Sequence, residues 1–307
     1  MARRLRIQFP GAIYHVINRG NYRRDLFADV GAAKSFEDAL GDAAVRFEWT
    51  VHAYCLMQNH FHVALVTVTP NLGDGMHWLH TTFALRFNRY RSEHGHLFQG
   101  RYRSPLVEDA SALVRVVNYI YLNPVRAGIV PAERLTDFRW SSLARFVNGS
   151  RPEWLSPSMW LGELGMTDRR NDWSRYARDL RVLAGDPAEQ TRQGFDTLGR
   201  DWAIGSRGWK EALAREYGRR SLEQDLPRGE TIALKEQRWL SALGDELRRH
   251  GKDKSAPARE ARNVGWKVEV ALALRKRVGA PYRWIAHALV MGSPLAVRVA
   301  VFRLCNM

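Results

Sequence analysis

The 307-residue sequence has only two cysteines, Cys55 and Cys305, and they lie far apart. This excludes the disulfide framework of a small secreted protein, and we expect a cytoplasmic protein. No run of about eighteen apolar residues is present, which argues against a membrane span. Polar residues and Pro10 follow Met1 too soon for the apolar core of a signal peptide.

Positive charge, by contrast, is in excess. Lys and Arg number 47 against 32 Asp and Glu, which gives a net charge of +15 and a pI near 10.3. Both halves share this excess, with +6 in residues 1–150 and +9 in the remainder. Such a charge favours polyanions such as nucleic acid. A ribosome-associated or simply soluble basic protein would have the same composition, so charge alone does not identify the chemistry.

The hydrophobic pattern of the first 150 residues predicts an α+β domain. An antiparallel sheet with helices packed on it fits the order of the elements. We expect Asn123-Pro124 to end the last helix, because the residue before a proline is pushed out of the helical region. The expected strands are 11–18, 47–56, 60–68 and 98–107, and the expected helices are 30–46, 72–90 and 110–122.

The second half is expected to be mainly helical. Residues 151–250 form a helical region without a readable role, and 251–257 resemble a linker. Residues 258–307 then have the pattern of a helix-turn-helix, whose second helix enters the major groove of DNA. In that interpretation Ser293 caps the second helix, and Arg298 and Arg303 face phosphates or bases. An ordinary α-hairpin in a helical domain would have the same pattern. The three expected helices are 267–278, 280–290 and 294–304.

Candidate metal ligands occur on the third expected strand. His60 and His62 are two residues apart and therefore point to the same face, whereas Phe61 points to the other. Two neutral imidazoles can hold a divalent metal ion but need a third protein ligand. Most histidine pairs are structural or solvent-facing; the strand and the apolar residue between them favour this pair. Two other pairs compete, His94 with His96 in a polar loop and His77 with His80 at helical spacing.

The candidate nucleophile is Tyr119. Arg115 precedes it by four residues and Asn123 follows it by four, so the three share one helical face. A tyrosine hydroxyl is protonated at neutral pH and needs a metal or a base to act as a nucleophile. The amide oxygen of Asn123 would complete a metal's ligand shell. On these residues alone, the simpler interpretation is a half-buried helical tyrosine with its hydroxyl at the surface.

Four stretches together resemble the single-tyrosine HUH transposases, and among them the REP-associated tyrosine transposases. They follow one another in the family's order within the first 150 residues, roughly half of the chain. Gln58 replaces a proline that the family usually has, at a position that only shapes a turn. His94 and His96 fall outside the family's metal motif. The stretches are Tyr14–Asn21 (YHVINRGN), Ala53–His62 (AYCLMQNHFH), Leu97–Ser104 (LFQGRYRS) and Tyr119–Gly128 (YIYLNPVRAG).

The resemblance implies a fold like that of relaxases and rolling-circle replication initiators. It also implies that His60, His62 and Asn123 bind a divalent metal ion, Mg²⁺ or Mn²⁺, which acts on the scissile phosphate. Tyr119 would attack this phosphate, leaving a 5′-phosphotyrosine and a free 3′-hydroxyl, and strands would be rejoined without ATP. The expected partner is single-stranded or hairpin DNA, with the C-terminal region adding duplex contacts. The expected contacts to DNA are Arg19, Arg23, Arg101, Arg103 and Arg115, together with Arg298 and Arg303.

Three other functions remain open from the sequence. The first is a DNA-binding regulator with a decayed nuclease site, although the four site residues are intact. The second is a single-strand-binding or structural protein with a metal-stabilised core. The third is a relaxase or replication-initiator nickase, whose chemistry would be identical. The family also includes homodimers, so both monomer and homodimer remain open. All the DNA-linked functions predict association with the bacterial nucleoid.

Overall fold

The computed structural model describes residues 7–217 and 228–305. Contacts divide the chain into two compact units at Ser206 and Arg207. We call the described residues before this point the N-terminal unit and those after it the C-terminal unit. The sequence places its boundaries near residues 150 and 250 instead. The N-terminal unit runs further because residues 151–206 add a strand to its sheet and helices that pack against earlier helices of the unit.

The N-terminal unit is built on a five-stranded sheet with the order β2-β3-β1-β4-β5. β2 and β3 form a hairpin, β3 pairs with β1, and β1 pairs with β4, all antiparallel. The short pair β4–β5 is parallel. This confirms the predicted α+β class and its largely antiparallel sheet. The strands are β1 (Ile13–Arg19), β2 (Trp49–Met57), β3 (His60–Thr67), β4 (Leu106–Val107) and β5 (Ala203–Ile204).

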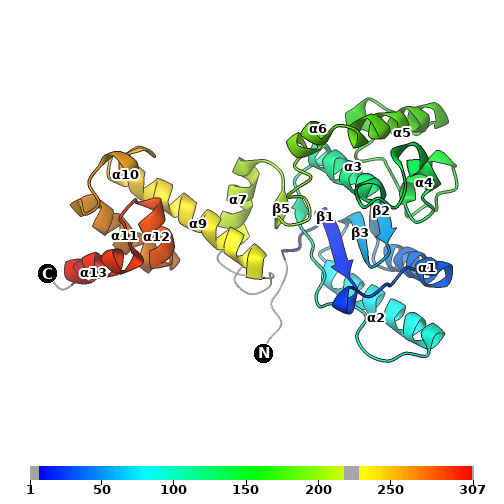
Figure 1. The fold of residues 1–307 in the computed structure, drawn as a ribbon, viewed down its shortest axis with the longest axis horizontal. Helices are drawn as coiled ribbons and strands as arrows, with labels where there is room; N and C mark the ends of the chain where they lie inside the picture. Colours follow the sequence, from blue (N-terminus) through cyan, green and yellow to red (C-terminus); the bar gives the residue numbers. More distant parts are fainter. Residues whose placement is uncertain (1–6, 218–227, 306–307) are drawn as a thin grey trace. The chain divides into compact units, whose positions relative to one another are not determined.

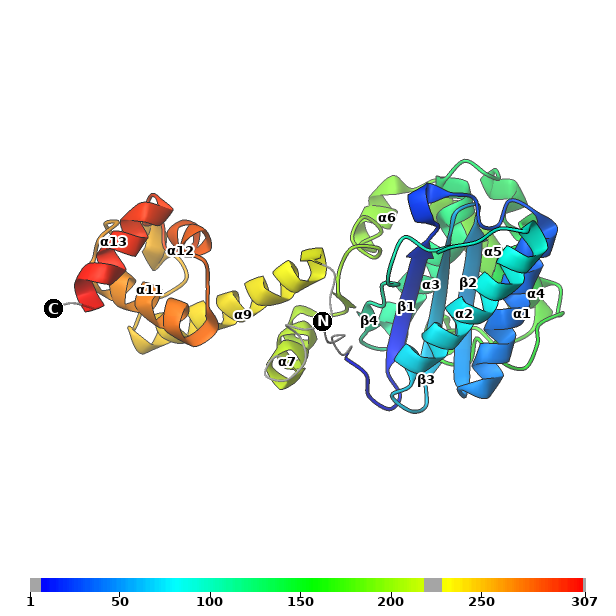
Figure 2. The same cartoon turned by 90° about the horizontal axis from the view of Figure 1, so that it is seen from below.

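Helices cover both faces of the sheet (Figures 1 and 2). α1 (Val30–Arg46) and α2 (Leu72–Arg91) pack against each other on one face, and α3 (Ala110–Arg126) lies on the other. The side chains of β3 alternate accordingly, because successive residues of a strand point to opposite faces. Phe61 packs against the rings of Phe36 on α1 and His80 on α2, whereas His62 faces a ring of α3. One face of the sheet is therefore an aromatic core, and the other carries polar groups.

Aromatic residues pack the later helices of the unit behind α3. Trp160 and Trp173 contact Tyr176, whose ring also meets that of Tyr121 on α3. The Tyr176 hydroxyl donates a 2.7 Å hydrogen bond to the Asn118 side chain. These contacts hold α3, on its side away from the sheet, against α5. The remaining helices of the unit are α4 (Ser142–Val147), α5 (Arg170–Ala184) and α6 (Pro187–Arg192), with short 3-10 turns at Asn21–Arg23, Ala132–Asp137 and Gly162–Leu164.

The expected strand over residues 98–107 was wrong in most of its length, since only Leu106–Val107 form a strand. Gly100 adopts a φ of +143°, a backbone conformation open mainly to glycine, and this interrupts the extended run. Arg103 still exchanges two backbone hydrogen bonds with Ile17 in an isolated bridge. The segment therefore stays beside β1 without forming a continuous strand.

The expected end of α3 was also wrong, because the helix continues through Pro124 to Arg126. Pro124 lacks only the amide hydrogen that would bond to the Ile120 carbonyl in the preceding turn. The side-chain amide of Asn123 donates to the Tyr119 carbonyl at 2.9 Å, and the Ala127 N–H donates to the Asn123 carbonyl at 2.9 Å. These bonds support the last turn around the proline.

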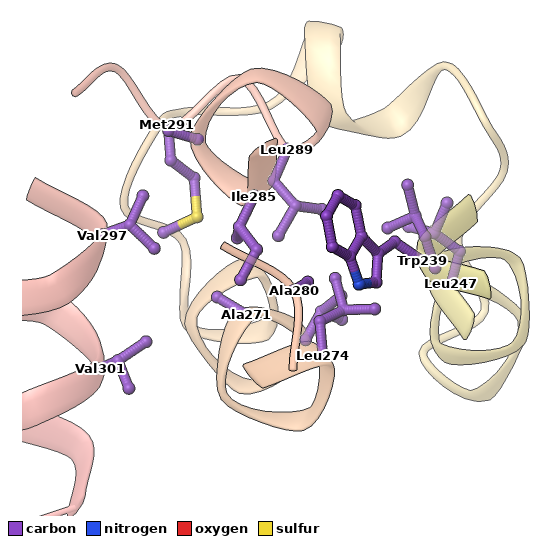
Figure 3. Packing of buried hydrophobic residues seen from close by; sticks show 13 residues of the cluster. Trp239, Leu247, Ala271, Leu274, Ala280, Ile285, Leu289, Met291, Val297 and Val301 are labelled. Atoms are coloured by element: carbon purple, nitrogen blue, oxygen red, sulfur yellow. The ribbon is translucent and has the colours of Figure 1, made fainter. Parts of the chain in front are cut away.

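The C-terminal unit is helical, as expected. Its core joins Trp239 of α9 to Leu274, Ile285 and Val297 of the last three helices (Figure 3). The predicted linker over residues 251–257 is part of the same unit. Its Lys252 forms a 2.7 Å ion pair with Glu260. The helices are α7 (Arg207–Tyr217), α9 (Arg228–Arg249), α10 (Ala256–Arg259), α11 (Gly265–Val278), α12 (Tyr282–Ala288) and α13 (Pro294–Cys305).

The turn between α12 and α13 has the predicted cap. The hydroxyl of Ser293 accepts a 3.2 Å hydrogen bond from the Ala296 N–H, which satisfies a donor in the first turn of α13. Gly292 adopts a φ of +85°, as tight turns before a helix require. The three helices predicted from the sequence are thus present. No helix in residues 7–217 and 228–305 has the length and apolar character needed to cross a membrane.

His52 is expected to make the stability of the N-terminal unit depend on pH. It lies buried on β2, and its Nδ1–H donates to the Ser156 carbonyl at 2.7 Å. Burial lowers its pKa from 6.5 to about 4. As the pH falls from 6.5 towards 4, the unfolded chain binds a proton that the folded chain does not. The free energy of unfolding therefore decreases, by about 3 kcal/mol at most for this group.

A His52→Asn variant tests this expectation. Asparagine keeps a donor for Ser156 but does not titrate in this range. Urea unfolding followed by tryptophan fluorescence should show that the variant loses less stability than the wild type between pH 7 and about 4.5. Equal losses in the two proteins would contradict the assignment.

Candidate active site

The polar face of β3 holds two imidazoles side by side. The rings of His60 and His62 have centroids 5.1 Å apart, and His62 is only 4% exposed. The Nδ1–H of His60 donates to the Asn59 side-chain oxygen at 2.8 Å. His62 Nδ1 lies 3.0 Å from Nε2 of His15, a buried residue of β1. In both rings Nδ1 is thus occupied, and Nε2 is the nitrogen left to act as a ligand.

Burial keeps these rings neutral. It lowers the pKa of His60 from 6.5 to about 4, with the nearby charge of Arg19 as the second cause. Burial also holds the pKa of His62 well below its usual range, helped by its two histidine neighbours. The same effect lowers the pKa of His15 to about 3. All three rings are therefore neutral imidazoles at neutral pH. This is the form of histidine that binds metal ions.

Tyr119 faces this pair from α3. Its ring makes edge contacts with His62, at a centroid distance of 5.6 Å, and with His15 at 5.8 Å. Tyr121, two residues on, points away and hydrogen bonds to Ser142 at 3.1 Å. The helical periodicity predicts this separation, because residues two apart on a helix lie on opposite sides. The structure thus brings the three principal predicted residues together.

Asn123 lies one turn after Tyr119 and is 8% exposed. Its amide nitrogen donates to the Tyr119 carbonyl, which leaves its oxygen as the side-chain atom with ligand character. Within the described ranges, no cluster of three His, Cys, Asp or Glu side chains could hold a metal ion. A metal at His60 and His62 would therefore need a ligand of another type, and the Asn123 oxygen meets that need chemically.

A segment far along the chain completes the site. Phe195 packs edge-on against the Tyr119 ring at 5.5 Å. Gly199 lies so close to the Tyr119 hydroxyl that a Cβ at this position would be 3.2 Å from it. The carbonyl of Leu198 lies 3.3 Å from His15 Nδ1. Residues 195–199 therefore line both Tyr119 and the buried His15.

Arg126 places a positive charge beside the Tyr119 ring. Its guanidinium lies 5.2 Å from the centre of the Tyr119 ring and 5.4 Å from that of Phe195. Arg126 is exposed, so its charge can also meet a phosphate from solvent. The sequence analysis did not include Arg126 in the site because it predicted that α3 ends before Pro124. Arg126 shares the face of Tyr119 only when the helix continues through Pro124.

The sequence contains a signal for His15 that the prediction of site residues did not use. It belongs to the YHVINRGN stretch, and β1 pairs with β3 so that Ile17 faces His62 across the strands. His15 is the diagonal neighbour on the same face. Phe195 and Leu198 had no local signal, because no motif links them to residues about 75 to 180 positions earlier.

The predicted DNA-binding arginines lie in different surroundings. Arg19 is exposed at the end of β1, in register with His60, and Arg115 is partly exposed one turn before Tyr119. The guanidinium of Arg103 donates to the carbonyls of Gly199 and Arg200, so it anchors the segment beside the site. Arg23 and Arg101 are exposed in the N-terminal unit, and Arg298 and Arg303 are exposed on α13 of the C-terminal unit.

Part of this chain is similar to known proteins. Residues 8–123 match the family model described as IS200-like transposases. The match confirms the resemblance inferred from the motifs and supports a transposase function for this part of the chain. A solved REP-associated tyrosine transposase bound to a REP hairpin is 18% identical, with a TM-score of 0.40, and the alignment covers 50% of this chain and 89% of that one. No curated protein has a significant match.

Proposed function

From the similarity of residues 8–123 to the IS200-like transposases, we propose that the protein cleaves and rejoins single strands of DNA through a covalent bond to Tyr119. One observation carries this proposal. The Tyr119 ring lies beside His62, one of two neutral imidazoles whose Nε2 atoms have no hydrogen-bond partner among the described residues. A tyrosine with no role beyond packing would not need this polar, buried neighbourhood.

The residues present fit a divalent metal ion. His60 and His62 would supply two nitrogens and Asn123 an amide oxygen, and this mixed set suits Mn²⁺ and is compatible with Mg²⁺. When bound, the ion supplies Lewis-acid stabilisation of the charge that develops on the scissile phosphate. Imidazole ligands also bind zinc and copper tightly, so the proposed ion is the one that supports activity rather than the one that binds most strongly.

The chemical step belongs to Tyr119. Its phenolic oxygen attacks the phosphorus, the bond from phosphorus to the 3′-oxygen breaks, and a 5′-phosphotyrosine forms. The phenolic proton is lost, and the departing 3′-oxygen takes up a proton to become a hydroxyl. Attack by a 3′-hydroxyl on the phosphotyrosine reverses the step and rejoins strands without an external energy source. Arg126 beside the Tyr119 ring would neutralise the phosphate during both steps.

We further propose that the substrate is single-stranded or hairpin DNA. The backbone of an unpaired strand can approach a tyrosine that is held among aromatic rings on a buried helix more easily than a duplex can. Arg19 and Arg115 flank the site from β1 and from α3 and would contact the backbone on either side.

The proposal is tested by incubating the full-length protein with Mn²⁺ and a labelled library of single-stranded hairpins. A covalent protein–DNA adduct that survives denaturation and disappears with a chelator is the expected result. Clear binding of DNA with no adduct for any hairpin would contradict the proposal and favour a DNA-binding regulator.

For the C-terminal unit we propose contacts to duplex DNA through α13. Its exposed face combines Arg298 and Arg303 with Leu295, Val299 and Phe302. Arginines contact phosphates or guanines, and apolar side chains can contact the methyl group of thymine. A purely structural α-hairpin would give no reason for the two arginines to share the open face.

The full-length variant Arg298→Ala/Arg303→Ala tests this proposal. Each lost phosphate contact lowers the slope of the logarithm of affinity against the logarithm of salt concentration by about 1. We expect the slope for duplex DNA to fall by about 2, while cleavage of a short hairpin is retained. The matched control, Arg178→Ala/Arg181→Ala, removes the same charge from exposed positions of α5 and should change the slope little. Equal slopes for wild type and the α13 variant would contradict the proposal.

A further inference from the structure

A relay of two hydrogen bonds runs from a backbone carbonyl to His62. Leu198 O lies 3.3 Å from His15 Nδ1, and His15 Nε2 lies 3.0 Å from His62 Nδ1. His15 is completely buried, and His62 nearly so. All three residues belong to the N-terminal unit, but Leu198 lies outside the part that matches the family model.

The chemistry of the carbonyl sets the direction of both bonds. A carbonyl oxygen can only accept, so His15 Nδ1 carries the hydrogen. In a neutral ring the other nitrogen is then an acceptor, and His15 Nε2 must receive a hydrogen from His62 Nδ1. His62 therefore has its hydrogen on Nδ1 and a free lone pair on Nε2. The reverse tautomer of His62 would place two acceptor nitrogens 3.0 Å apart.

We propose that His15 is a positioning residue, which holds His62 in the tautomer and ring orientation that present Nε2 as a ligand. The inference rests on the metal-dependent function proposed above. His60 is held differently, by its own neighbour Asn59 at the partly buried start of the strand. His62 is buried, so water cannot substitute for His15 as the acceptor of its hydrogen. The Leu198 carbonyl makes the relay depend on residues 195–199 as well as on the sheet.

Two substitutions at position 15 separate this role from packing alone. His15→Gln places an amide oxygen near the position of the imidazole Nε2 and can still accept from His62. His15→Leu fills a similar space but accepts no hydrogen bond. If His15 only packs, the two variants should behave alike. If it positions His62, the glutamine variant should retain the Nδ1–H tautomer of His62 and the affinity for Mn²⁺. The leucine variant should lose both.

The first readout needs neither metal nor DNA. Long-range ¹H–¹⁵N spectra of the labelled full-length protein at neutral pH distinguish the two tautomers of His62, and a His62→Ala sample identifies its signals. We expect the Nδ1–H tautomer in the wild type and in His15→Gln, and its loss or mixing in His15→Leu. Thermal unfolding checks that each variant is folded. A pure Nδ1–H tautomer in folded His15→Leu would overturn the proposal.

The second readout is the affinity for Mn²⁺ alone, measured from the electron paramagnetic resonance signal of the free ion. Outer hydrogen-bond partners of metal-binding histidines commonly change affinity by about 10–100-fold, and we expect a loss of this size in His15→Leu but not in His15→Gln. Unchanged Mn²⁺ affinity in folded His15→Leu overturns the role of His15 only. A wild type that binds no Mn²⁺ overturns the proposed function, and the role of His15 with it.

Discussion

Replacing Tyr119 by phenylalanine is expected to abolish the covalent protein–DNA adduct and to lower strand cleavage by at least about a thousandfold. The variant keeps the ring that packs against His62 and Phe195 and loses only the hydroxyl. Removing the nucleophile of a covalent mechanism leaves only the residual catalysis that binding and electrostatics provide. Affinity for hairpin DNA should stay nearly constant, because the hydroxyl contributes little to binding an exposed backbone.

Tyr121→Phe is the matched control for this experiment. The substitution is chemically identical, two residues further along the same helix, but the lost hydroxyl bonds to Ser142 on the other side of α3. The cost should be about 1 kcal/mol of stability, with the adduct retained. A Tyr119→Phe protein that still forms an adduct would place the nucleophile elsewhere.

The second large effect is expected at His62. Alanine at this position removes a proposed ligand, and cleavage in Mn²⁺ should fall by more than about 100-fold, since even outer-shell changes can reach that size. Binding of Mn²⁺ should weaken in parallel, whereas binding of hairpin DNA in the presence of a chelator should be preserved. Both measurements are needed, because a simple folding defect would lower DNA binding as well.

His94→Ala/His96→Ala provides the control for His62. These two histidines have the same spacing as His60 and His62 but lie exposed in a loop. Their removal should leave cleavage and Mn²⁺ affinity within about twofold of the wild type, as expected for surface substitutions away from a site. Full cleavage by His62→Ala in Mn²⁺ would contradict the proposed metal site.

Much of the sheet and of the candidate site could be predicted because the signals are local. Alternation on β3 placed His60 and His62 on one face with Phe61 on the other, and the structure has this arrangement. Helical spacing placed Tyr119 and Asn123 together on α3. Such patterns follow from the periods of strands and helices and need no knowledge of distant residues.

The remaining features depended on distant contacts or on a rule with exceptions. Arg126 was missed because Pro124 predicts a helix end, whereas hydrogen bonds from Asn123 and Ala127 carry the helix past it. The contact of Leu198 with His15 joins residues 183 positions apart, and only the folded chain brings them together. The parallel strand β5 was missed because two residues give no readable period.

The central claim is a covalent bond between DNA and Tyr119, and mapping that bond tests it most directly. The adduct formed with Mn²⁺ and a cleavable hairpin would be digested with nuclease and protease, and the phosphorylated peptide identified by mass spectrometry. We predict a single modified residue, Tyr119, carrying a 5′-linked nucleotide. Attachment to any other residue, or cleavage that leaves no linked peptide, would contradict the account.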